Sequence, residues 1–179
     1  MSDLPAMPAP ELSRPIDIRG ITDKPVVIEA NEAERGALAR RFGLVSLDSL
    51  TATLVLDTEG SEVNVTGPLR ARIVQSCAVS GEDLPVTIVE EIALRFVPES
   101  DWAEEDAEEV ELSEDELDAV PYDGTQFDLG EAVAQSLGLA IDPYAVGPEA
   151  DEARRRHGLV EEGEPNGPLA DALRGLKGS

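Results

Sequence analysis

The fold is decided by residues 50–97, which read LTATLVLDTEGSEVNVTGPLRARIVQSCAVSGEDLPVTIVEEIALRFV. Apolar and polar side chains alternate there with a period of two in three runs, which is typical of strands that bury one face. These runs are 50–56, 62–77 and 86–97. Because short polar turns separate the runs, the pattern predicts an antiparallel sheet with one covered face. Gly67 and Pro68 interrupt the second run, where we expect a bulge or a bend.

The chain before these runs contains signals for two short strands and one helix. In order, they are 15–19, 25–30 and 31–42. Asn31 followed by Glu34 is a capping-box pattern, which marks the start of the helix, and Gly43 ends it. Residues 1–13 hold three prolines and little that could pack, so we expect a flexible arm there.

The composition changes abruptly after the third run. Residues 99–118 carry twelve acidic residues and no basic residue. Such a block repels itself and buries little apolar surface, so we expect an acidic, flexible insertion over 99–120. An apolar stripe at helical spacing then predicts a helix that begins near Asp128 and stops at Asp142-Pro143.

This order of elements predicts an α+β fold. We expect a small antiparallel β-sheet, either open or curled toward a barrel, with one or two packed helices. A single α+β domain spans 14–147, and 148–179 form a polar C-terminal tail in which a short helix would carry Leu169, Leu173 and Leu176 on one face. These leucines fit a partner's groove and an intramolecular sheet edge equally well, because the two uses look identical in one sequence.

The charge of the chain restricts its partners. The 14 Lys and Arg residues stand against 38 Asp and Glu residues, for a formal net charge of −24. Because binding to a nucleic acid or to an anionic membrane depends on basic side chains, both are disfavoured, whereas a basic protein is attracted. The cluster Arg154–Arg156 is the one candidate for a phosphate contact, and three such contacts contribute little without a supporting surface.

Candidate catalytic, cofactor and metal residues are not found. The chain has one cysteine and one histidine, so a cysteine-rich zinc site is excluded. Cys77 shares its parity with Leu69, Ala71 and Ile73, so we expect a buried, structural and inert cysteine, whose pKa only an electropositive setting would lower. His157 belongs to the polar tail and is expected to be solvated.

The location of the chain is expected to be cytoplasmic. One cysteine forms no intramolecular disulfide, which suits a reducing compartment. The first residues lack a basic segment followed by an apolar run, so no signal peptide is expected. No run of about 18 apolar residues is present, so no membrane-spanning helix is expected.

The central stretch resembles the YceD family of large ribosomal RNA subunit accumulation proteins. The resemblance rests on VTGPLRARIVQSCAVSGEDLP at 65–85, LRFVP at 94–98 and FDLGEAV at 127–133. It covers roughly 15–145 in order of elements, and PNGPLADAL at 165–173 is similar to the end of some members. Many members have a second cysteine three residues after the first, where this chain has Ser80, so a metal or redox role of that pair does not carry over.

The resemblance implies a role in accumulation of 23S rRNA and in large-subunit assembly. Combined with the charge, it implies a non-enzymatic factor that binds a basic ribosomal or assembly protein. The candidate partner-binding residues are Glu104, Glu105, Asp106, Leu169, Leu173 and Leu176. The alternatives are an acidic adaptor or nucleic-acid mimic for an unrelated basic protein, and a small enzyme, which requires a deep polar pocket.

Overall fold

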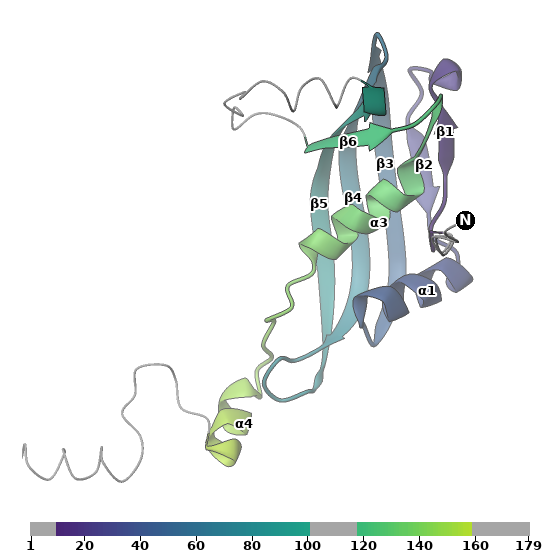
Figure 1. Cartoon of the computed structure of the whole chain (residues 1–179). Coiled ribbons are helices and arrows are strands. Elements are labelled where there is room, and N and C mark those ends of the chain that lie inside the picture. The colour runs from purple at the N-terminus through teal and green to yellow at the C-terminus, as the bar shows by residue number, and fades with distance from the viewer. Residues whose placement is uncertain (1–9, 101–117, 159–179) are drawn as a thin grey trace, which may run out of the picture. The chain divides into compact units, whose positions relative to one another are not determined.

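The structure is a computed structural model, which describes residues 10–100 and 118–158 (Figure 1). Its described residues divide into two compact units. The first contains 10–75, 85–100 and 118–142, and the second contains 76–84 and 143–158. Each unit is described below by itself.

A five-stranded sheet forms the centre of the first unit. Its strands are β2 (Val26–Glu29), β3 (Ser46–Glu59), β4 (Glu62–Ser76), β5 (Asp83–Pro98) and β6 (Asp118–Tyr122), and they lie in that order. A separate antiparallel pair is formed by β1 (Pro15–Asp17) and β7 (Gln126–Asp128). With β2 and β6 at its two edges, the described sheet is open, so the α+β prediction is confirmed and its barrel alternative is not adopted.

The prediction of a wholly antiparallel sheet is wrong for β6. β2 and β3 are antiparallel, as are β3 and β4, but β6 runs parallel to β5, with Leu94 opposite Asp118 and Pro98 opposite Tyr122. Nineteen residues connect Pro98, the end of β5, to Asp118, which lies opposite Leu94. A connection of that length permits parallel pairing, which a two-residue turn does not.

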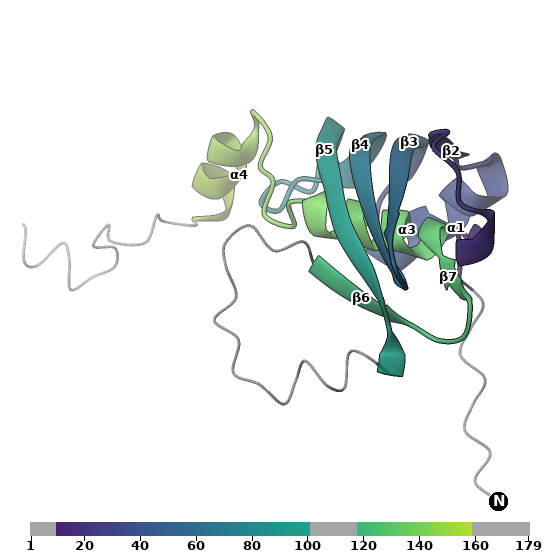
Figure 2. The ribbon, with the colours of Figure 1, turned by 90° about the horizontal axis from the view of Figure 1, so that it is seen from above.

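Two helices pack on the sheet of the first unit. α1 (Glu32–Phe42) begins with the predicted capping box, in which Asn31 accepts from the Glu34 N–H and Glu34 accepts from the Asn31 N–H. α3 (Leu129–Ala140) crosses one face of the sheet (Figures 1 and 2). Its predicted stripe is buried, with Leu129, Val133 and Leu137 fully inaccessible to solvent.

The core consists of the inward-facing residues of the strands. In β4 the alternation is complete, and Val63, Val65, Leu69, Ala71 and Ile73 are each at most 1 % exposed. Phe96 of β5 stacks on Phe127 with ring centroids 4.1 Å apart. The strand periodicity therefore predicted the buried face correctly.

The predicted irregularity at Gly67 and the observed one differ. The register of β3 and β4 shifts between Leu47 and Ser49, so the bulge lies in β3. Gly67 has a φ of 144°, and a Cβ atom at this position would collide with the Thr53 carbonyl oxygen. Gly67 is thus required for the close approach of the two strands.

The N-terminal arm is shorter than predicted. Leu12 is fully buried in the core, and the Ser13 hydroxyl donates to Asp128, so residues 1–13 are not a loose arm throughout. Gly130 makes this packing possible because any side chain there would meet the backbone of Leu12. The predicted strand 15–19 also ends early, since residues 18–20 form a 3₁₀ turn, η1 (Ile18–Gly20).

Two boundaries in the C-terminal half also need correction. The acidic insertion predicted over 99–120 overlaps β6, and Val120 of that strand packs against the core. In the second unit, α4 (Ala150–His157) is a helix within the segment that was predicted to be a polar tail. Gly158 ends it in the left-handed conformation, and Ala150 and Ala153 are buried, which a composition-based reading did not detect.

Candidate functional site

The six predicted partner-binding residues lie outside the described part of the chain. Glu104, Glu105 and Asp106 belong to 101–117, and Leu169, Leu173 and Leu176 belong to 159–179. Their roles therefore stay predictions. The described residues offer four other features: the Cys77 loop, the arginines of α4, a groove between α1 and β3, and the outer edge of β5.

The Cys77 loop belongs to the second unit. Cys77 is 4 % exposed, and its Sγ accepts hydrogen bonds from the Ser80 N–H and the Gly147 N–H, each at 3.3 Å. The Ser80 hydroxyl and these backbone groups stabilise the thiolate and lower the pKa of Cys77 from its ordinary 9.0 to about 6. The loop is closed further by a hydrogen bond from the Cys77 N–H to the Glu82 carbonyl.

Burial of Cys77 agrees with the sequence interpretation, and its structural, inert role stays a prediction. The expectation that only an electropositive setting lowers the pKa of Cys77 needs correction, because the Ser80 hydroxyl and backbone N–H groups lower it without a cation. Gly147 lies seventy residues away in sequence, so no local pattern could have indicated it. Within the described residues, no group of three or more His, Cys, Asp or Glu side chains could hold a metal ion.

The arginines of α4 are engaged within their own helix. Arg154 pairs with Asp151 at 2.9 Å, and Arg156 pairs with Glu152 at 3.0 Å. Arg155 donates to the Asp151 carbonyl. Because these pairs offset much of the positive charge, the cluster offers a weak phosphate site, and His157 is exposed at the end of the helix as expected.

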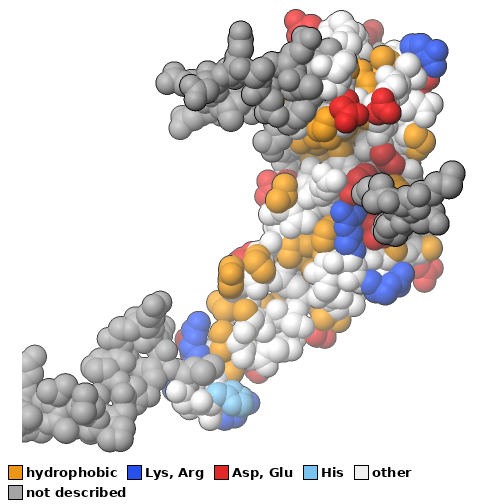
Figure 3. Space-filling model, viewed as in Figure 1, with side chains coloured by type: hydrophobic (Ala, Val, Ile, Leu, Met, Phe, Trp, Pro, Cys, Tyr) orange, Lys and Arg blue, Asp and Glu red, His pale blue; other side chains and the backbone are white. Residues whose placement is uncertain are grey.

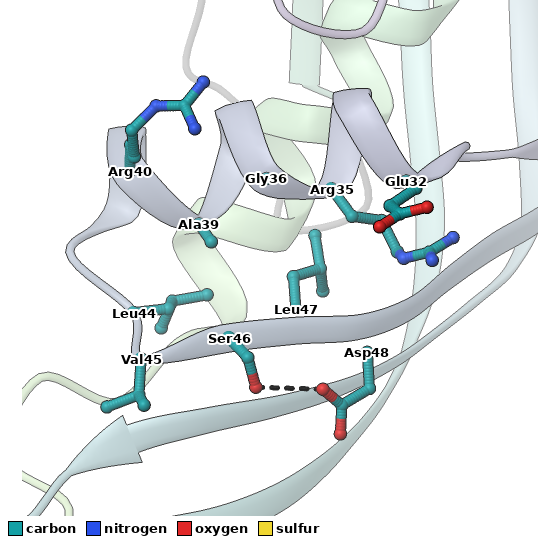
Figure 4. A pocket seen from close by; sticks show the side chains of 10 residues that line it. All are labelled: Glu32, Arg35, Gly36, Ala39, Arg40, Leu44, Val45, Ser46, Leu47 and Asp48. Atoms are coloured by element: carbon teal, nitrogen blue, oxygen red, sulfur yellow. Dashed lines mark hydrogen bonds between the residues drawn. The ribbon is translucent and has the colours of Figure 1, made fainter.

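A groove of about 550 Å³ lies between α1 and β3 (Figure 4). Leu44 and Leu47 line its apolar part, and the Ser46 hydroxyl donates to Asp48 at 2.9 Å. Arg35 and Glu32 lie along the helix side, while Arg40 points away from the strand (Figure 4). Both signs of charge are present around this groove, so it has no electrostatic preference for a basic ligand.

The outer edge of β5 borders a second groove of about 270 Å³. Residues of β5 and of the end of α3 line it: Glu90, Glu91, Ile92, Ala93, Leu94, Ser136, Leu139 and Ala140. Its charged side chains are all acidic, in contrast to the groove at α1. Hydrophobic side chains gather along α3 on the face shown in Figure 3, and Leu139 is 85 % exposed.

Two further residues position this region: Gln75, which the sequence analysis did not single out, and Asp128, which it placed at the start of the helix. Gln75 is 6 % exposed, and its Nε2 donates to the Asp142 carbonyl at 2.7 Å, which ties β4 to the chain just after α3. Asp128 caps α3 by accepting from the Glu131 N–H and also accepts from the Arg14 N–H. The parity of Gln75 with Ile73 was a usable signal for a buried amide, because alternate residues of a strand share a face.

Six of the eleven arginines in the described residues form ion pairs with acidic side chains. Ion pairs join Arg14 to Glu34, Arg41 to Glu11 and Glu131, and Arg95 to Glu62. Since the chain carries a net charge of −24, little positive charge is left for an external phosphate group. No helix in the described parts of the chain is both long and apolar enough to cross a membrane.

Comparison with known proteins identifies the family. The model of the family described as "Large ribosomal RNA subunit accumulation protein YceD" matches residues 65–172, which is more than half of the chain. No curated protein and no solved structure matches significantly. The match starts within β4 and includes the Cys77 loop, β5, β6, β7, α3 and α4. The chain therefore belongs to the YceD family of large ribosomal RNA subunit accumulation proteins.

Proposed function

We propose that this protein supports accumulation of 23S rRNA in the cytoplasm as a non-enzymatic factor that binds a basic protein of the large ribosomal subunit or of its assembly. The family links the chain to ribosome biogenesis. The observation that carries the finer proposal is the charge, a net −24, with six of the eleven described arginines in ion pairs with acidic side chains. Such a surface attracts basic proteins and repels the rRNA backbone.

Ribosomal proteins must be kept from binding the wrong nucleic acid before they assemble, and an acidic binder does this by covering their positive surface. The acidic block at 99–118 would steer the encounter, because complementary charge raises association rates, and this effect falls with salt.

The test combines a cellular and a binding measurement. In cells that lack the protein, we expect the ratio of 23S to 16S rRNA to fall and to be restored by the wild-type chain. With purified basic proteins of the large subunit, we expect the association rate to decrease at least about tenfold between 50 and 300 mM salt. Unchanged 23S rRNA in the depleted cells would overturn the biogenesis role.

Direct rRNA contact is tested with a variant in which Arg154, Arg155 and Arg156 are all alanine. We expect this variant to restore 23S rRNA as well as the wild-type chain does, since these side chains are engaged within α4. A variant that folds but fails to restore 23S rRNA would show that the arginines contact RNA and that the charge argument is incorrect.

A further inference from the structure

β5 is an edge strand over most of its length. It has 16 residues, but β6 pairs only with Leu94–Pro98. Among the residues that the structure describes, no strand lies on the outer side of Val86–Ala93. Alternate N–H and C=O groups of an edge strand point away from the sheet, and such a row is a template for one more strand.

The groove beside this edge suits the side chains of an added strand. Ile92 is 3 % exposed and forms the apolar base, while Leu94 is half-buried and Leu139 is 85 % exposed. An added strand places every second side chain on the same face. An apolar residue at these positions would cover Leu139 and fill part of the 270 Å³ groove.

The negative charge of the β5 edge determines which kind of segment can bind there. Glu90 and Glu91 point to opposite faces of β5, and both are exposed. A second copy of this chain would bring the same two carboxylates and a charge of −24 to the edge. The chain's own residues 101–117 are strongly acidic as well, and like charges on neighbouring strands are destabilising. A basic segment is the occupant that the charges favour.

We propose that the outer edge of β5, Val86–Ala93, binds an extended basic segment of a partner protein by β-strand addition. Main-chain hydrogen bonds to the edge hold the segment. Its apolar side chains enter the groove of Ile92, Leu94 and Leu139, and its Lys or Arg side chains lie on the other face, near Glu91. The Glu90 carboxylate adds to the negative charge of the edge. The inference rests on the proposed function, because it assigns a site and a binding mode to the basic partner.

The first experiment uses a synthetic probe, a fluorescent peptide of alternating lysine and valine, KVKVKVKV. A matched peptide of the same charge, KVKPKPKV, has prolines at the two central valines and cannot complete the main-chain hydrogen bonds. With the full chain at 150 mM salt, we expect the proline peptide to bind at least about tenfold more weakly, measured by fluorescence anisotropy. We also expect the first peptide to slow hydrogen exchange in Val86–Ala93. Equal affinities, or protection elsewhere, would overturn the proposal.

The second experiment uses variants with matched controls. We expect E90K/E91K to weaken KVKVKVKV binding about tenfold and L139K to weaken it about fivefold, since both alter exposed side chains of the groove. D57K/E59K makes the same change in charge at exposed positions of β3, and V27K places a lysine on the exposed Val27 of β2. We expect both controls to bind within about twofold of the wild type. Equal weakening by the charge-matched pairs would show non-specific attraction.

Two further outcomes would identify a different occupant. If the amides of Val86–Ala93 exchange slowly in the chain without peptide at low concentration, residues 101–117 cover the edge. Protection that appears only with a concentration-dependent dimer would mean that a second copy covers it. Either result would overturn the proposal.

The same variants separate this inference from the proposed function. The wild-type chain, E90K/E91K and D57K/E59K are each tested for binding to purified basic proteins of the large subunit. If both variants bind these proteins as strongly as the wild type does, the edge site is wrong and the proposed function stands. If the wild-type chain binds none of these proteins, the proposed partner class is wrong, and the peptide measurements still decide the edge.

Discussion

Two exposed strand edges of the five-stranded sheet differ: the edge strand β2, and the part of β5 that extends beyond its pairing with β6. β2 has four residues, and Arg14 donates from Nη2 to the Glu29 carbonyl at 3.2 Å while its Nη1 pairs with Glu34 at 2.8 Å. β5 has 16 residues, of which only the last five pair with β6. A side chain of the N-terminal segment thus bonds a carbonyl at the end of the short strand, whereas Val86–Ala93 of the long strand has no strand beside it among the described residues. Edges left open at this length are exceptional because they invite pairing, which is why we assign this one to binding.

The largest expected difference lies within β5 itself, between its paired and its open stretch. Phe96, which is 2 % exposed and stacks on Phe127, belongs to the paired stretch. We expect Phe96→Ala to lower the free energy of unfolding by about 3–5 kcal/mol. Val89 in the open stretch is 55 % exposed, and Val89→Thr is expected to cost less than about 0.5 kcal/mol.

Urea unfolding of both variants checks this contrast. If Val89→Thr destabilised the chain as much as Phe96→Ala does, the open stretch would be covered by part of the chain in solution. The comparison of the two stretches would then be wrong.

Polar contacts with Asp128 hold the N-terminal segment against the start of α3. Asp128 caps α3 and accepts from the Arg14 N–H at 2.8 Å and from the Ser13 hydroxyl at 2.6 Å. We expect Asp128→Ala to lower the free energy of unfolding by about 1–2 kcal/mol, which is the upper range for loss of a helix cap. In addition, hydrogen exchange of β1 is expected to accelerate more than that of β4. Uniform acceleration would show that Asp128 does not specifically hold the N-terminal segment.

The same contacts predict a dependence on acid. Burial raises the pKa of Asp128, but the hydrogen bonds from Arg14, Ser13 and the start of α3 outweigh it, and the net pKa lies below the ordinary 3.8. A lowered pKa in the folded state means that the stabilisation is complete above the unfolded value and is lost as the pH falls through the folded value. We expect the wild type to lose more stability than Asp128→Asn between pH 5 and pH 2.5, measured by urea unfolding. If the free energy of unfolding falls equally with pH in both proteins, the pKa of Asp128 is not lowered by folding.

The last expected effect concerns the loop between β4 and the open stretch of β5. Hydrogen bonds from the Ser80 hydroxyl and from backbone N–H groups lower the pKa of Cys77 to about 6, against an ordinary 9.0. The thiolate therefore stabilises the fold above about pH 9, and this contribution is lost as the pH falls from 9 to 6. Relative to Cys77→Ala, we expect the reduced wild-type chain to gain stability from pH 6 to pH 9. A difference that stays constant with pH would mean that the thiol is not stabilised as an anion.

Local signals were reliable where a residue and its partners are close in sequence. The capping box of Asn31 and Glu34 was predicted correctly because its hydrogen bonds span three residues. The buried face of β4 followed from alternation alone. In contrast, Leu12 is buried because its backbone lies directly against Gly130, more than a hundred residues later in the chain. No local sequence pattern includes both residues.

The candidate binding site could not be predicted from local sequence patterns. The residues that the sequence favoured for binding, among them Glu104 and Leu173, lie outside the described residues and stay predictions. The edge of β5 was not considered, because a strand pattern shows which face is buried but does not show whether a neighbour pairs with its edge. Which part of the edge is covered depends on where the chain after β5 forms β6. The residues of β5 do not indicate that this pairing begins at Leu94.

The sequence by itself determined the α+β class, the buried face of the strands and the acidic character that favours a basic partner, because periodicity and charge are properties of neighbouring residues and of their sum. Only the tertiary structure decided that β6 is parallel to β5 and pairs with five of its residues, that Gly147 donates to Cys77, and that Leu139 ends beside an open edge. These outcomes depend on which distant segments pack together, and packing is chosen by the free energy of the whole fold rather than by any local pattern.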